Sequence, residues 1–156
     1  MQLPTARADG SVTYEQRNYV VQIQRDGTLQ IKEHWQVHFS GGPFHHAFLA
    51  LYLAKTSGIT FGQVTGDGVT NQQVSETTDA SGNPMLQVAW DYPATSDATR
   101  TFDILYAVQG ALGIGTSQAW LDWHFFDGGS ETSFPVDAAE VRVTLPAATD
   151  AQQLTI

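Results

Sequence analysis

The chain has 156 residues, which suffices for one domain with a core of ordinary size, and 42% of them are hydrophobic, which argues against disorder. The chain has seven Lys and Arg and 16 Asp and Glu, so its net charge is −9. A chain with this charge would be repelled by nucleic acids and by anionic lipid surfaces. Cysteine is absent, which excludes disulfides and thiolate metal sites, and no apolar run approaches the roughly 20 residues that span a bilayer.

The clearest predicted element is a strand over residues 28–39. Apolar and polar residues alternate along it, which is typical of a strand with one buried face. The predicted inner face carries Leu29, Ile31, Glu33, Trp35, Val37 and Phe39. Residues 18–24 show the same alternation, and Asp26 and Gly27 stand between the two runs. Because Asp-Gly is a strong hairpin signal, we expect the two strands to pair.

The rest of the chain is predicted to form short strands separated by turn residues. They are expected at 44–53, 59–65, 69–77, 85–90, 100–109, 118–126 and 136–145. A polar loop is expected at 91–99 and a flexible, glycine-rich connection at 110–117. Short strands at regular spacing, without helical periodicity, predict an all-β fold, namely an antiparallel β-sandwich. Immunoglobulin-like and jelly-roll-like topologies are both left open.

The alternation also predicts the core and the extent of the domain. The expected core residues are Tyr19, Val21, Ile23, Leu29, Ile31, Trp35, Val37, Phe39, Phe102, Ile104, Tyr106, Val141, Val143 and Leu145. We expect an N-terminal extension over 1–17, the β-sandwich over 18–146, and over 147–156 a tail that leads to a linker or membrane segment. The first residues lack the pattern of a secretory signal, and Ile156 follows closely on a predicted strand. We therefore expect the chain to be an excised piece of a longer protein.

Several of these segments together resemble one family. They are YVVQIQRDG at 19–27, LQIKE at 29–33, GPF at 42–44, FDILY at 102–106, AWLDW at 119–123, and the strand from 136 that ends in VRVTLP. Over about residues 18–146 the chain is similar to the N-terminal extracytoplasmic domain of the YciQ-like predicted membrane protein family, whose function is unknown. The resemblance implies a domain outside the cytoplasmic membrane, anchored by helices elsewhere in the protein, and no known activity. Members usually carry an arginine shortly after the GPF-like turn, where Leu49 stands here.

Glu33 fits its predicted position least well. The alternation places its carboxylate on the apolar face between Ile31 and Trp35, where an unpaired charge is costly or has its pKa shifted upward. One interpretation is a tuned acid, base or ligand in a pocket. We favour the other, a structural carboxylate that is bonded to backbone N–H groups, to Arg100 or to Arg142, or that a bulge turns outward.

An aromatic and acidic segment offers a candidate binding surface. Trp120 and Asp122 share one face of the predicted strand 118–126, whereas Trp123 shares the other with Leu121. One face is therefore expected in the core and the other partly exposed. The candidate binding residues are Trp120, Asp122, Trp123 and Glu33, and a sugar or a peptide is the ligand that such a surface suits.

No catalytic, metal or cofactor site is predicted. The spacing of the histidines suits no shared metal ion, and His34 and His38 would lie about 13 Å apart on one extended strand. The other three are His45, His46 and His124. Asp67 and Asp79 stand in turns, outside any calcium-loop pattern. A glycosidase needs two carboxylates at a defined distance. The candidates are Asp91, Asp103, Asp122 and Asp127, and the sequence does not show how far apart they lie in space.

The sequence therefore predicts a non-enzymatic extracytoplasmic binding or interaction module of a membrane-anchored protein of unknown function. An exposed sheet edge or an aromatic face is the expected means of binding. The expected partner is an unknown protein or glycan, without nucleic acid, and with membrane contact only through segments outside this chain. The alternative is a carbohydrate-binding or carbohydrate-active β-sandwich that uses the aromatic and acidic face.

Overall fold

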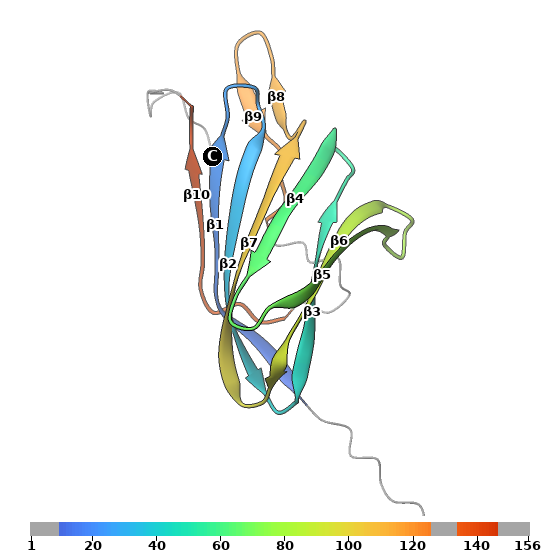
Figure 1. The fold of residues 1–156 in the computed structure, drawn as a ribbon. Coiled ribbons are helices and arrows are strands. Elements are labelled where there is room, and N and C mark those ends of the chain that lie inside the picture. The colour runs from blue at the N-terminus through green and yellow to red at the C-terminus, as the bar shows by residue number, and fades with distance from the viewer. Residues whose placement is uncertain (1–9, 126–133, 147–156) are drawn as a thin grey trace, which may run out of the picture.

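The computed structural model describes residues 10–125 and 134–146, and strands are the only regular secondary structure in them (Figure 1). In chain order they are β1 (Ser11–Ile23), β2 (Leu29–Ser40), β3 (Phe44–Tyr52), β4 (Gly58–Thr65), β5 (Thr70–Thr78), β6 (Pro84–Thr95), β7 (Ala98–Gln109), β8 (Leu112–Ile114), β9 (Ala119–Leu121) and β10 (Ala139–Thr144). They form a large sheet in the order β10-β1-β2-β7-β4, a small sheet in the order β3-β6-β5, and the hairpin β8-β9. Large and small sheets enclose one core, which confirms the predicted all-β sandwich.

The hairpin of β1 and β2 forms as predicted. The strands pair antiparallel, and in the turn Gly27 has a φ of 84° while the Thr28 N–H donates to the Asp26 carboxylate at 2.9 Å. However, β1 begins at Ser11, well before the predicted strand. The register with β2 shifts between Tyr14 and Gln16, which marks a bulge that interrupts the alternation. This irregularity hid the first part of the strand from sequence analysis.

Residues 91–99 are strand and tight turn, so the predicted loop is wrong. β6 continues to Thr95, β7 begins at Ala98, and Asp97 between them has a φ of 47°. Proline and polar residues in this segment are typical of loops, and they caused the error. In the pairing with β3 the register jumps from Asp91 to Thr95, so Pro93 lies in an irregularity where the ladder needs no N–H donor.

β10 differs from the prediction in direction and exposure. It joins the edge of the large sheet parallel to β1, so the sandwich is not wholly antiparallel. Val141 lies beside the buried Tyr19 and Val143 beside Val21, yet their exposed fractions are 39% and 42%. Their assignment to the core is therefore wrong, because nothing in the described part of the chain covers this edge strand. Leu145, by contrast, is partly buried against the core.

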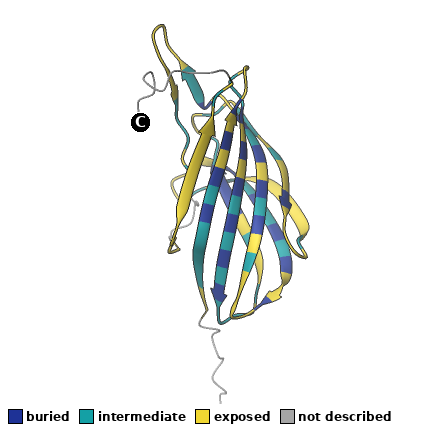
Figure 2. Cartoon of the chain, turned by 90° about the vertical axis from the view of Figure 1, so that its left-hand side faces the viewer, coloured by how far each residue is buried: buried dark blue, intermediate teal, exposed yellow. Residues whose placement is uncertain are grey.

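The core lies between the two sheets. All the predicted core residues from Tyr19 to Tyr106 are buried, and Figure 2 shows the alternation as bands along the strands. The ring of Trp90 in β6 lies 5.6 Å from that of Trp35 in β2 and 5.6 Å from that of Phe102 in β7. These aromatic contacts join the small sheet to the large one. No helix long and apolar enough to cross a membrane occurs in the described residues.

Candidate functional site

Glu33 is buried on the inner face of the large sheet, where three side chains hold it. The Tyr106 hydroxyl donates to Oε1 at 2.6 Å, and Trp35 Nε1 donates to Oε2 at 2.7 Å. The Arg17 guanidinium lies 3.5 Å from the same Oε2, and the exposed fractions of these two charged side chains are 7% and 1%. The contacts come from β1, β2 and β7, so the carboxylate links three neighbouring strands. They agree with the structural interpretation that we favour for Glu33.

The arginine beside Glu33 is not one of those expected from the sequence. Arg100 donates to the Asp67 carbonyl at 3.0 Å, and Arg142 pairs with Glu140 at 2.8 Å on the surface. Both expected pairings are therefore wrong. Arg142 lies opposite the exposed Val20 on the outer face of the sheet, so it cannot reach a buried charge. Arg100 lies opposite Val37 on the inner face, but it is bonded to Asp67 and Thr95 instead of Glu33.

Arg17 is surrounded by aromatic rings. Its guanidinium carbon lies 5.0 Å from the ring centre of Trp35, 5.3 Å from that of Tyr14 and 5.6 Å from that of Tyr19. These are distances at which a cation is attracted by the face of a ring. The bulge in β1 makes this arrangement possible, because Tyr14 lies opposite Val37 and Arg17 opposite Trp35, both on the inner face. The rings and Glu33 together replace the water that the cation loses.

Burial sets the protonation of the cluster. It raises the pKa of Glu33, and the Arg17 charge and the bonds from Tyr106 and Trp35 act in the opposite direction without cancelling it. Burial, and then the neighbouring Glu33, raises the pKa of Tyr106 well above its ordinary value. The Tyr106 hydroxyl therefore keeps its proton and acts as a donor to the carboxylate.

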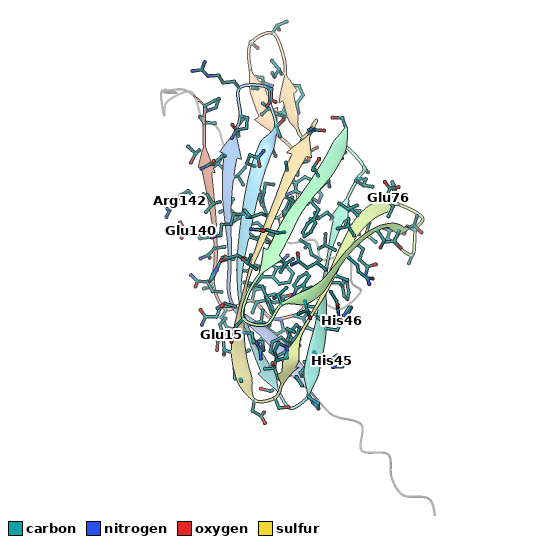
Figure 3. All side chains as sticks on the ribbon, viewed as in Figure 1. Glu15, His45, His46, Glu76, Glu140 and Arg142 are labelled. Carbon is teal, nitrogen blue, oxygen red and sulfur yellow. The ribbon has the colours of Figure 1, made fainter. Side chains whose placement is uncertain are left out.

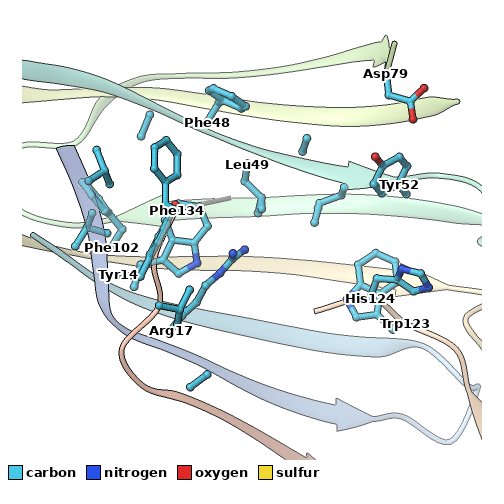
Figure 4. Close-up of a pocket in the computed structure, with 18 of the residues that line it drawn as sticks. Tyr14, Arg17, Phe48, Leu49, Tyr52, Asp79, Phe102, Trp123, His124 and Phe134 are labelled. Atoms are coloured by element: carbon cyan, nitrogen blue, oxygen red, sulfur yellow. The ribbon is translucent and has the colours of Figure 1, made fainter. Parts of the chain in front are cut away.

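A cleft of about 1260 Å³ opens between the two sheets. Figure 4 shows Tyr14, Arg17, Phe102 and Phe134 at one end of it. Most of the remaining wall is apolar and includes Leu49. The volume exceeds the roughly 300–1,000 Å³ of common small-molecule sites. The cleft can therefore admit a ligand far larger than water.

Polar groups gather at the other end of the cleft. Lys55 Nζ lies 3.0 Å from Asp122 Oδ2, and His124 Nε2 lies 3.9 Å from Asp122 Oδ1. Tyr52 and Asp79 lie at this end as well (Figure 4). The ion pair is largely exposed, so it contributes little to stability and leaves Lys55 accessible to a ligand.

The structure separates the four predicted binding residues. Asp122 and Trp123 line the cleft, whereas Glu33 does not line it and instead contacts two residues that do, Arg17 and Trp35. Trp120 lies on the β8-β9 hairpin, where its ring packs over Gly113 and 51% of its surface is exposed. Trp123 packs against the core and Trp120 does not, but β9 ends at Leu121, so the predicted strand over 118–126 is too long.

The histidines and carboxylates pair off across strands. His34 Nδ1 lies 2.8 Å from Asp103 Oδ1, and His46 Nδ1 lies 2.8 Å from Asp91 Oδ1. Within residues 10–125 and 134–146, no group of three His, Cys, Asp or Glu side chains is arranged to hold a metal ion. Asp127, one of the predicted glycosidase candidates, lies outside the described residues.

Arg17 was not predicted as part of the site, although the sequence contains a signal for it. Stepping by two from Val21 through Tyr19 toward the N-terminus leads to Arg17 and places it on the inner face. Leu49, at the position where the resemblance implies an arginine, is buried in β3 with 2% exposure and lines the cleft. In this chain the buried cation thus comes from β1.

Comparisons with known proteins give one family match and several distant structural likenesses. Residues 13–156 match the family described as "Predicted membrane protein (DUF2207) N-terminal domain". No curated protein matches. An M1 zinc metallopeptidase from Deinococcus radiodurans is similar at 17% identity, with a TM-score of 0.49, over 88% of this chain and 33% of that one. For a putative protease from Parabacteroides distasonis the identity is 9% and the TM-score 0.39, over 63% and 23% of the two chains. The chain thus spans a third or less of the length of these proteins.

Proposed function

The chain belongs to the family of N-terminal domains of the predicted membrane proteins called DUF2207, and on that premise we propose that it is an extracytoplasmic, non-enzymatic binding module. We infer that the ligand is an elongated apolar molecule, such as a fatty acyl chain, and that it binds in the cleft between the sheets. The observation that carries this proposal is the cleft itself, which is large, mostly apolar and open to solvent.

The distribution of polar groups in the cleft supports an amphipathic ligand. One end is lined by Tyr14, Phe102 and Phe134, which suits an apolar chain. The other end carries Lys55, whose ammonium could pair with a terminal carboxylate. A domain of a membrane protein also lies close to a source of such molecules.

Filling the cleft is expected to weaken binding. Ala47 in β3 lines the cleft, so Ala47→Phe places a ring in the space that the ligand would occupy. We expect the affinity for the fluorescent apolar probe N-phenyl-1-naphthylamine, and for palmitate that displaces it, to fall about tenfold or more, which corresponds to about 1.4 kcal/mol. The measurement is a fluorescence titration of the purified chain.

Val20→Phe is the matched control for the cleft. Val20 is 38% exposed on the opposite face of the large sheet, so the added ring should leave probe binding unchanged. Absence of binding to the wild-type chain, or equal affinity in Ala47→Phe, would contradict the proposal. Binding to a glycan array that Trp120→Ala abolishes, together with no palmitate binding, would instead favour the carbohydrate alternative.

The proposed orientation has its own test. Charged residues are 15% of the chain, below the roughly 25% of typical soluble domains, and secreted β-rich proteins share this feature. In the full-length membrane protein, a cysteine at Val74, which is 45% exposed, should react with a membrane-impermeant maleimide in intact cells or spheroplasts. Val88→Cys, at the paired and fully buried position, is the unreactive control. Labelling of Val74→Cys only after lysis would place the domain in the cytoplasm.

A further inference from the structure

The large and small sheets have four edge strands, β10, β4, β3 and β5, and among the described residues only β10 pairs in a regular register. Each of the other three has a register irregularity, which disfavours pairing with another chain. These irregularities lie between Phe44 and His46 in β3, Phe61 and Gln63 in β4, and Thr70 and Gln73 in β5. The β8-β9 hairpin pairs regularly, but its strands have only three residues each and offer a partner little backbone. β10 keeps continuous register with β1 over its six residues and contains no Gly, Pro or Lys. It therefore lacks the bulge, glycine and proline that commonly block edge-to-edge contact, and its charged side chains are Glu140 and Arg142.

The backbone of β10 offers a row of hydrogen-bonding groups to a partner strand. The Arg17 N–H donates to the Ala138 carbonyl at 3.0 Å, so the backbone groups of Ala138 point toward β1. Because these groups alternate in direction along a strand, those of Ala139, Val141 and Val143 point away from β1. No other strand in the described part of the chain pairs with this side of β10.

The side chains of β10 are complementary to the same strand running in the opposite direction. Glu140 and Arg142 lie on the outer face and project from the edge of the molecule, as Figure 3 shows. Val141 and Val143 lie on the inner face, where they are partly exposed and continue the apolar surface of the large sheet. A partner strand that offers one anion, one cation and two valines at this spacing would match both faces.

We propose that β10 pairs antiparallel with β10 of a second copy of this chain, about a twofold axis at Val141. In this register Val141 faces Val141, and each Glu140 faces Arg142 of the other copy, which gives two cross-strand ion pairs. A register centred on Arg142 would set the two arginines opposite each other, and one centred on Glu140 would set the two glutamates opposite each other. Shifting the two strands by an odd number of residues would place the backbone groups that point away from β1 in one copy opposite groups that point toward β1 in the other. Registers centred on Ala139 or Val143 keep the backbone alignment but lose both ion pairs, so charge favours the register centred on Val141.

The resulting dimer is weak in dilute solution and favoured on a membrane. One edge strand buries far less surface than the roughly 1,200–2,000 Å² of stable interfaces, and the net charge of −9 on each copy opposes association. Anchoring in a bilayer raises the effective concentration of the two copies. The interaction is therefore expected to depend on concentration and to need physiological ionic strength, at which long-range repulsion is screened beyond about 8 Å.

Disulfide trapping tests the proposed register, and the absence of native cysteine keeps it free of background. In the proposed dimer the two Val141 Cα atoms lie about 5.5 Å apart, within the range for a disulfide. Under mild oxidation Val141→Cys should form covalent dimers at least about tenfold faster than Arg142→Cys, which tests the competing register. Val74→Cys, an exposed valine on the edge strand β5, reports random collisions.

Charge reversal provides the second part of the experiment. In the Val141→Cys background, Glu140→Arg or Arg142→Glu alone should slow dimer formation about tenfold, because like charges then face each other. The combined reversal should restore the rate, since opposite charges are again paired. Equal trapping rates at Val141, Arg142 and Val74, or no response to the reversals, would overturn the proposal. All these positions are exposed, so the variants are expected to fold.

Discussion

Glu33→Ala is expected to lower the free energy of unfolding by about 3–5 kcal/mol, the usual cost of breaking a buried ion pair by removing one partner. The change leaves the Arg17 guanidinium buried without its counter-charge, and it leaves the Tyr106 hydroxyl and Trp35 Nε1 without their acceptor. A guanidinium cannot lose its proton at any ordinary pH. Arg17→Met should cost less, because the remaining carboxyl group can take up a proton.

Urea unfolding of the two variants and of Lys32→Ala measures the effect. Lys32 is the control, because its ion pair with Asp103 lies on the surface, at 3.5 Å with 49% and 33% exposure. Removing it should change the free energy of unfolding by no more than about 1 kcal/mol. A loss of that size in Glu33→Ala as well would show that the buried pair contributes no more than a surface one.

The pH dependence of the same carboxylate follows from the direction of its pKa shift. Burial raises the pKa of Glu33 in the folded state above its unfolded value of about 4.3. The part of the stability that depends on this pKa shift is therefore complete below about pH 4.3 and is lost as the pH rises through the folded pKa. The contacts of the ionised carboxylate with Arg17, Tyr106 and Trp35 remain at higher pH. Against Glu33→Gln, which does not titrate, the wild type should lose relative stability as the pH rises. The opposite slope would show that Arg17 and the two hydrogen-bond donors outweigh burial.

Sequence periodicity predicts the strands whose two faces differ and fails where the backbone is irregular. β2 alternates without interruption, and each of its predicted inner residues is buried, Glu33 included. In β1 the bulge beside Glu15 hides the first half of the strand. Pro93 makes the end of β6 look like a loop, because sequence does not reveal that the ladder is interrupted opposite it. β10 alternates as a core strand does, yet burial depends on what lies opposite, and the alternation contains no such information.

The candidate site could be predicted only in part, because its residues come from different strands and a strand pattern describes one strand at a time. Alternation showed that a carboxylate would be buried at Glu33, but its arginine is on another strand, and choosing among arginines requires the register. Trp120 and Trp123 were expected on opposite faces of one strand, and of the two only Trp123 packs against the core. The cleft depends on the space between two sheets, which no single strand pattern describes. Local patterns thus predict faces, and tertiary packing decides which faces meet.

Trp90→Ala is expected to cost about 3–5 kcal/mol in the free energy of unfolding, as for other fully buried large side chains. Trp90 is 0% exposed, and its ring joins the small sheet to Trp35 and Phe102 of the large sheet, 5.6 Å away in each case. Truncation would leave a cavity between the two layers at the point where they are held together. Sheets that pack face to face cannot collapse easily onto such a cavity, because each is stiffened by its own ladder.

Trp120→Ala is the control, with the same change of residue at a site that is 51% exposed on the β8-β9 hairpin. It should change the free energy of unfolding by less than about 1 kcal/mol, because no cavity forms between the sheets. The two variants are compared by urea unfolding. Far-ultraviolet circular dichroism follows the transition, because it reports mainly the backbone and depends little on the missing indole. Equal losses would mean that the Trp90 contacts between the sheets contribute no more to stability than the exposed indole of the hairpin does. The large difference that we expect follows from which of the two indoles lies between the sheets.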